Sequence, residues 1–197
     1  MLAHLRRSLI MAVICLVFFG FVYAFAATGV SQLLFRSQAN GSLTANGSLL
    51  IGQNWSSPRW FHGRPDDTGP YACVKGVGGG DNPLVANGCA GSSGNTALGP
   101  HSATLKANTL ALVTYWHALG VNPTIDLVTT SGSGYDPDIS QLDAMVQIPM
   151  VARATGVSPA ALRSLIRRET HPAQWGFLGS SYINVLQLNE GLAKLEG

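Results

Sequence analysis

The longest uncharged stretch of this chain lies near its N-terminal end, where the 28 residues from Ser8 to Phe35 include no Asp, Glu, Lys or Arg. A helix needs about 20 apolar residues to cross a bilayer core of about 30 Å, and residues 9–28 supply them. Arg6 and Arg7 precede the stretch, so the positive-inside bias predicts a cytoplasmic N-terminus. The polypeptide that follows the span is then expected on the extracytoplasmic side.

A cleaved signal peptide is the alternative interpretation. A basic start, an apolar core and the small-x-small sequence Ala24-Phe25-Ala26 also fit such a peptide. The uncharged stretch is longer than the usual apolar region of about 7–15 residues, which favours a retained anchor. We therefore expect a cytoplasmic N-terminus at residues 1–8, a transmembrane helix at 9–30, a connector at 31–50 and a soluble domain at 51–197.

The charge of the chain changes after the span. The whole chain has a formal charge of +2, but residues 37–197 contain 9 Lys and Arg against 10 Asp and Glu, which gives −1. Nucleic-acid binding depends on neutralising phosphates with a basic surface, so it is not expected here. A segment of this length forms one hydrophobic core without disulfides or metals, and a single domain is predicted.

Apolar periodicity and capping signals predict that this domain is a compact mixture of helices and a small sheet, an α+β fold. Ser140 and Asp143 form a capping pair, and Ser158 followed by Pro159 is typical of a helix start. Helices are expected at 105–119, at 140–155, from 158 onward and at the C-terminal end. Short strands are expected at 49–51, 125–129 and 182–188.

The segment at 52–71 indicates a loop, yet it contains four aromatic residues, Trp55, Trp60, Phe61 and Tyr71. So many aromatic side chains in an irregular segment must pack against something. The core of the same domain is the expected partner, and the surface of another protein is the alternative.

Three cysteines raise the question of redox chemistry. Cys15 lies within the predicted span, whereas Cys73 and Cys89 flank a Gly-rich stretch on the side expected to be oxidising. The latter two either close a loop of about 17 residues as a disulfide or remain free thiols. A metal site is not expected, because no second Cys pair or spaced His pair accompanies them.

Polar residues that enzymes use are present, but in patterns more typical of structure. The carboxylates of Asp126, Asp136, Asp138 and Asp143 include pairs that general acid–base catalysis could use, although their positions suit turns and helix caps. No nucleophile elbow, P-loop or dinucleotide fingerprint is present. The alternative function belongs to a different class: an exported, membrane-anchored hydrolase that uses Asp136 or Asp138 with His62.

Several motifs, in one order, resemble the C subunit of the potassium-transporting P-type ATPase, the Kdp complex. The resemblance covers nearly the whole chain, and its most distinctive block is residues 126–137, DLVTTSGSGYDP. Asp138, directly after this block, stands where the family usually has His. The other motifs are ANGSL at 45–49, LIGQN at 50–54, PRWF at 58–61 with RP at 64–65, LGP at 98–100, QIP at 147–149 with VAR at 151–153, GFLG at 176–179 and NVLQLN at 184–189.

This resemblance implies a non-catalytic accessory subunit of a high-affinity, ATP-driven potassium importer in the bacterial inner membrane. The implied partners are a channel-like potassium-binding subunit, an ATP-hydrolysing P-type subunit and a small single-span subunit. The family is described as aiding assembly and as a catalytic chaperone that raises the ATP affinity of the ATPase subunit, so ATP is the implied ligand. Candidate nucleotide or partner contacts are Gln53, Arg59, Arg64, Ser131, Ser133, Asp136 and Gln147.

Two routes to the effect on ATP remain open at this stage. An extracytoplasmic domain acts on nucleotide affinity indirectly, through a shared conformational equilibrium. Direct binding of ATP, with Ser131, Ser133 and Gln147 as contacts, requires the opposite topology.

Within the span, Gly20, Ala24 and Ala27 recur at spacings of four and three. Small residues allow close approach of helices in lipid, which predicts packing against helices of partner subunits. Ordinary lipid-facing composition is the alternative.

Overall fold

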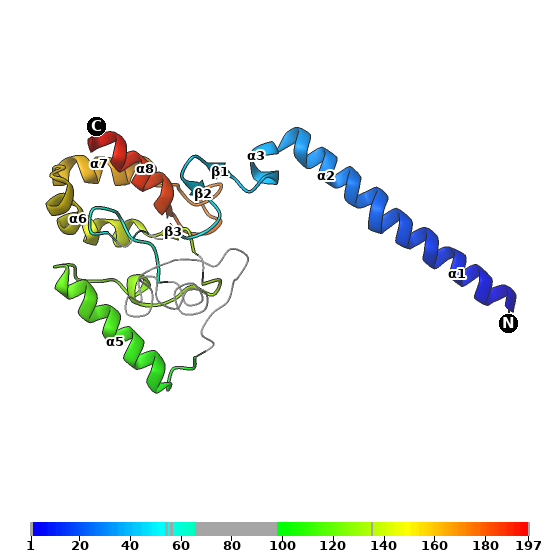
Figure 1. Cartoon of the computed structure of the whole chain (residues 1–197), viewed down its shortest axis with the longest axis horizontal. Helices are drawn as coiled ribbons and strands as arrows, with labels where there is room; N and C mark the ends of the chain where they lie inside the picture. Colours follow the sequence, from blue (N-terminus) through cyan, green and yellow to red (C-terminus); the bar gives the residue numbers. More distant parts are fainter. Residues whose placement is uncertain (1, 54, 56, 66–97, 135, 197) are drawn as a thin grey trace. The chain divides into compact units, whose positions relative to one another are not determined.

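The computed structural model describes residues 2–53, 55, 57–65, 98–134 and 136–196 (Figure 1). The chain divides into two compact units, residues 1–45 and 46–197, each of which is described by itself. Cys73, Cys89 and Tyr71 lie outside the described residues, so the predicted disulfide and the packing of Tyr71 lie outside them too.

The first unit is dominated by one long helix. This helix consists of α1 (Leu2–Val17), a π-helical turn η1 (Phe18–Val22) and α2 (Tyr23–Leu34). The short elements α3 (Arg36–Ala39) and β1 (Leu43–Thr44) follow it in the same unit. Leu2–Leu34 is the one helix among the described residues that is long and apolar enough to cross a membrane, with a mean hydropathy of 2.7 over its best 18-residue window. Gly20 lies in η1, and Ala24 and Ala27 lie in α2. Their contact with partner helices stays a prediction.

The second unit contains helices and two-residue strands. Its elements are β2 (Gly47–Ser48), α5 (Ala103–Ala118), the 3-10 turn η2 (Asp126–Val128), β3 (Asp138–Ile139), α6 (Gln141–Thr155), α7 (Pro159–Glu169), β4 (Ile183–Asn184) and α8 (Val185–Glu196). Strands β3 and β4 pair antiparallel, with Asp138 opposite Asn184 and Ile139 opposite Ile183. The prediction of mixed helices with small sheets is confirmed.

The predicted helix starts are confirmed because they depend on local chemistry. At the start of α6, the Ser140 hydroxyl accepts from the Asp143 amide while the Asp143 carboxylate accepts from the Ser140 amide, which is a complete capping box. The Ser158 hydroxyl accepts from the Ala161 amide at the start of α7. Helix α6 ends where Gly156 adopts a left-handed conformation with φ of 77°.

The core of the second unit forms where α6, α7 and α8 pack in sequence, α6 on α7 and α7 on α8 (Figure 1). The residues buried there include Val151, Leu162, Leu165, Ile166, Leu188 and Leu192. From α5, Trp116 is fully buried, and its indole donates to the carbonyl of Leu127 at 3.0 Å. Phe61 is also fully buried, which confirms that the aromatic segment packs on the core of its own domain.

Two predicted strands are wrong, and a third is much shorter than predicted. Residues 126–128 form a 3-10 turn, and residues 49–51 are a turn that follows β2. At 182–188, only Ile183 and Asn184 form a strand, and α8 begins at Val185. Helix α8 buries Val185, Leu188, Asn189 and Leu192, which is the i, i+3, i+4, i+7 spacing of one helix face.

Candidate functional site

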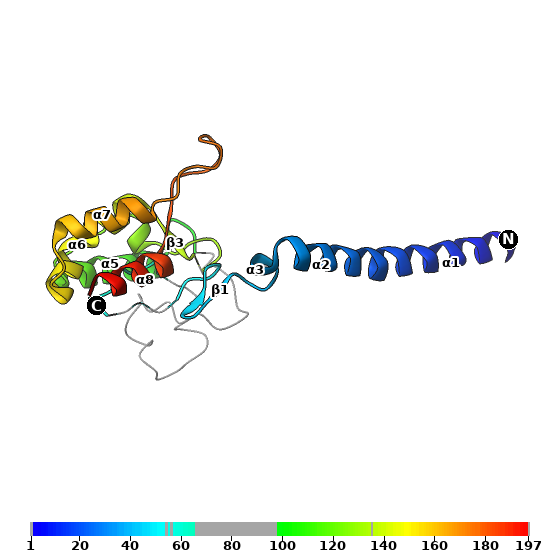
Figure 2. The same cartoon turned by 90° about the horizontal axis from the view of Figure 1, so that it is seen from above.

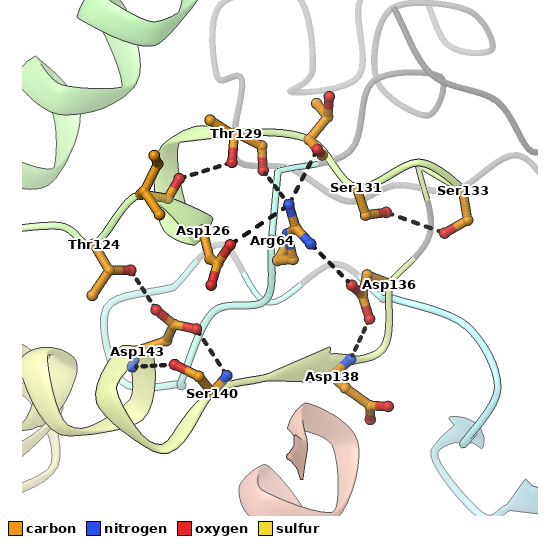
Figure 3. A network of polar contacts seen from close by, with 12 residues as sticks. Arg64, Thr124, Asp126, Thr129, Ser131, Ser133, Asp136, Asp138, Ser140 and Asp143 are labelled. Atoms are coloured by element: carbon orange, nitrogen blue, oxygen red, sulfur yellow. Dashed lines mark hydrogen bonds and ion pairs between the residues drawn. The ribbon is translucent and has the colours of Figure 1, made fainter. Parts of the chain in front are cut away.

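The side chain of Arg64 lies at the centre of a polar network that holds the distinctive 126–137 segment (Figure 3). Its guanidinium donates to the Asp136 carboxylate at 3.3 Å and lies 3.8 Å from the Asp126 carboxylate. It also donates to the carbonyls of Thr129 and Thr130 at 3.4 and 3.2 Å. A planar guanidinium with five N–H donors suits such a site, and here one side chain fixes both ends of the segment.

Ser131 and Ser133 lie in the turn between these two ends. Their hydroxyls are 3.1 Å apart, and the Ser131 hydroxyl also accepts from the Gly134 amide at 3.1 Å. Gly134 has φ of 70°, a conformation that side chains disfavour. Ser131 is buried and Ser133 is exposed, so Ser131 stabilises the turn while Ser133 is open to solvent.

Asp136 lies just before β3, and Asp138 is the first residue of that strand. The Asp136 carboxylate accepts from the Asp138 amide at 3.1 Å, and the Asp138 carboxylate accepts from the Asn184 side chain at 3.1 Å. Burial raises the pKa of Asp138, the bond from Asn184 lowers it, and the negative charge of Asp136 raises it further. Asp143, the helix-cap residue, accepts from the hydroxyl of Thr124. The expected turn and cap roles are confirmed for Asp136 and Asp143, whereas Asp138 lies in β3.

Two buried amide side chains, Gln147 of α6 and Asn189 of α8, bind the backbone of Phe61 and His62. The Gln147 amide accepts from the His62 N–H at 2.8 Å and donates to the His62 carbonyl at 3.0 Å. The Asn189 amide makes the same pair of bonds to Phe61, both at 2.9 Å. All four groups are buried, so these bonds replace those that neighbouring strands supply in a sheet. We call this arrangement the amide clasp.

His62 belongs to the same buried region. Its Nε2 lies 3.1 Å from the carbonyl of Ser57, so Nε2 carries the proton and donates. Its ring lies 5.3 Å from that of Trp116, centroid to centroid. Burial lowers the pKa of His62 to about 4, although the Ser57 bond opposes this shift. The recorded partners of His62 do not include Asp136 or Asp138, and the hydrolase alternative therefore has no support in the geometry.

The structure brings some candidate residues together and separates others. Gln53, Arg64 and Asp136 line one narrow crevice, where Gln53 donates to the carbonyl of Ser48 at 3.1 Å. Arg59 lies elsewhere, paired with Glu196 and stacked over Trp60 at 4.8 Å. Gln147 is fully buried within the amide clasp. Their contact with a nucleotide or a partner stays a prediction.

Sequence reasoning missed Asn189 as a structural partner of the aromatic segment. It also singled out Gln147 without its partner, His62. The partners are 128 and 85 positions apart in the chain. The signal available in the sequence was that each amide side chain stands at a position where the helix face is otherwise apolar. An amide buried on such a face requires hydrogen-bonding partners.

In the described part of the chain, one apolar helix is long enough to cross a membrane and is followed by one small α+β domain, an organisation that fits the class of membrane proteins with a single N-terminal span. The chain belongs to the KdpC family, described as the c chain of K⁺-transporting ATPase, whose sequence pattern matches residues 5–194.

Individual relatives agree with this assignment. The potassium-transporting ATPase KdpC subunit of Allorhizobium ampelinum is 38% identical over 201 residues, which cover 98% of this chain and 96% of the relative. The subunit of the same name from Methylobacterium nodulans is 39% identical over the full length of both chains. That of Gemmatimonas aurantiaca is 40% identical and covers 99% of this chain and 94% of the relative.

Proposed function

We propose that this chain is a non-catalytic accessory subunit of a high-affinity, ATP-driven potassium import complex. The observation that carries the proposal is the KdpC match over residues 5–194, which includes both the apolar helix and the folded domain. The relatives are named as subunits of a potassium-transporting ATPase. Its partners are a channel-like potassium-binding subunit, the ATP-hydrolysing subunit and a small single-span subunit.

The proposed topology is a single pass through the bacterial inner membrane. Leu2–Leu34 has the length and hydropathy of a membrane-spanning helix. Arg6 and Arg7 precede the apolar stretch, and the positive-inside bias favours a cytoplasmic N-terminus. The domain then lies outside the cell membrane, next to the channel-like subunit and near the potassium entrance.

The proposed role is to aid assembly and to raise the ATP affinity of the ATPase subunit from the opposite side of the membrane. An effect at that distance acts through a conformational equilibrium shared by the subunits. The polar groups of Arg64 and Gln147 support this indirect route, because both bind the chain's own backbone. The crevice beside Arg64 holds about 10 Å³, whereas small-molecule sites occupy about 300–1,000 Å³.

Sidedness and nucleotide affinity are tested together. Alkaline phosphatase fused to the C-terminal end should be active and green fluorescent protein should be dark, whereas a fusion without residues 2–34 should reverse both signals. In membranes that contain the other subunits, removal of this chain should raise the ATP concentration needed for half-maximal potassium-dependent ATPase activity. A fluorescent C-terminal fusion would overturn the topology, and an unchanged ATP dependence would overturn the role.

A further inference from the structure

The segment between α7 and β4 forms a hairpin that projects from the domain. Figure 2 shows it as the orange loop that rises above α7 and β3. At its base, His171 and Tyr182 exchange two backbone hydrogen bonds of 2.8 and 3.0 Å, and their rings stack at 5.0 Å. Nearer the tip, Gln174 and Leu178 exchange two bonds of 2.9 Å. The hairpin is therefore an ordered element with two fixed bridges.

The tip of this hairpin exposes large apolar side chains. Trp175 is 79% exposed, Phe177 is 74% exposed and Leu178 is 43% exposed. Single exposed apolar residues are common on proteins, whereas three large ones at one hairpin tip, two of them aromatic, are typical of an interaction surface. Tryptophan and other aromatic side chains are also enriched among the residues that dominate binding energy at protein interfaces.

The chain turns at the tip through two residues of positive φ, as a tight hairpin turn requires. Trp175 has φ of 53°, in the left-handed region that bulky residues avoid. Gly176 follows with φ of 83°, where the absence of a side chain makes this conformation easy. Asn, Asp or Gly is usual at such turn positions, whereas this turn has a tryptophan whose side chain is largely exposed.

The hairpin carries no charge, since residues 170–189 include no Asp, Glu, Lys or Arg. An anionic membrane surface is usually bound through Lys and Arg, which are absent here. Within the described part of the chain, the amides of Trp175, Gly179, Ser180 and Ser181 donate no hydrogen bond. Lipid tails offer no acceptors for buried amides, whereas a protein surface does. A neutral protein pocket with free backbone acceptors therefore fits the tip better than lipid.

We propose that this hairpin is a docking element that inserts Trp175 and Phe177 into a neutral, largely apolar pocket of another subunit of the transporter. This inference rests on the proposed function, because it takes its partner from the complex. The side chains enter the pocket, and the free amides of residues 179–181 bond to its backbone carbonyls.

The first experiment measures assembly of the full complex. Trp175→Ser combined with Phe177→Ser should reduce the amount of this chain that co-purifies with the other subunits in detergent at least about tenfold, because apolar anchors dominate binding. Trp175→Tyr should retain most of it. Leu142→Ser is the matched control, since Leu142 is 63% exposed on α6. Thermal unfolding of each full-length chain in detergent should be unchanged.

The second experiment identifies the partner directly. A photo-crosslinking phenylalanine derivative at position 177 should form adducts with a subunit of the transporter, and the same group at position 142 should not. Adducts with lipid alone, or none, would overturn the proposal, as would full assembly of the double variant. Failure of the unmodified chain to co-purify with the other subunits would overturn the proposed function as well. Normal assembly that the hairpin substitutions leave unchanged would overturn only this inference.

Discussion

The amide clasp predicts a large loss of stability from one isosteric substitution, Gln147→Met. Methionine has nearly the same length and volume but cannot hydrogen-bond to the backbone of His62. The N–H and the carbonyl of His62 both lose their partner in a buried site. Each unsatisfied buried group costs about 1–3 kcal/mol, and we expect the free energy of unfolding to fall by about 3 kcal/mol.

Urea denaturation of the full-length chain in detergent micelles, followed by tryptophan fluorescence, measures this loss. For a domain of this size, 3 kcal/mol corresponds to about 6–12 °C in Tm, which gives an independent check. Gln141→Met on the first turn of the same helix is the control, because Gln141 is partly exposed. A loss for Gln147→Met within about 0.5 kcal/mol of the control, the usual range for surface substitutions, would refute the reasoning.

A second variant, Gln147→Glu, tests the hydrogen-bond pattern itself. A protonated carboxyl group can accept from the His62 N–H and donate to the His62 carbonyl, as the amide does. An ionised carboxylate places a negative oxygen against that carbonyl, and burial opposes its charge. The Tm difference from the unmodified protein should therefore be large at pH 7 and shrink as the pH falls toward 4. A difference that is independent of pH would show that the bonds do not control stability here.

Three further predictions concern Arg64, His62 and Gly191. Arg64→Met should lower the free energy of unfolding by about 1–3 kcal/mol, because partly buried, charge-assisted bonds to Asp136 and two carbonyls are lost. Equal urea midpoints for variant and parent would contradict this. The pKa of His62 is about 4 in the folded chain and about 6.5 in the unfolded chain, so the unfolded chain binds more protons between these pH values. The free energy of unfolding should therefore fall as the pH drops from 6.5 to 4, by up to about 3 kcal/mol. His62→Phe should flatten this part of the stability curve, and an unaltered slope would assign it to other groups. A Cβ at Gly191 would lie 2.7 Å from Leu165 Cδ1, so Gly191→Ala should cost about 1–3 kcal/mol by overpacking. Its cost should disappear in a Leu165→Ala background, as a double-mutant cycle in urea would measure.

Local signals made the helix starts predictable from the sequence. The capping box of Ser140 and Asp143 and the start at Ser158 depend on residues within one turn of each other. The strand predicted at 182–188 is too long, because over so short a window its apolar residues fit both the period of a strand and the period of a helix. Only the inclusion of Asn189 and Leu192, also buried, distinguishes the helix face of α8.

The candidate site was predictable in composition but not in arrangement. The motif 126–137 and Arg64 were singled out, yet their pairing joins positions 72 apart for Arg64 and Asp136. The amide clasp joins positions still further apart. Such contacts follow from tertiary packing, which no local period or spacing encodes. The residues of the hairpin tip were noted as a motif at 176–179, but their exposure is a property of the folded domain.

The amide clasp also affects how the domain avoids unwanted association. A stretch of backbone with open donors and acceptors can recruit a strand from another molecule, which is a common start of aggregation. Phe61 and His62 are shielded from this by side chains of α6 and α8 instead of by a neighbouring strand. Loss of α8 would therefore expose an aromatic-rich stretch of backbone with open donors and acceptors. The resistance of this protein to aggregation would then depend on its last described helix.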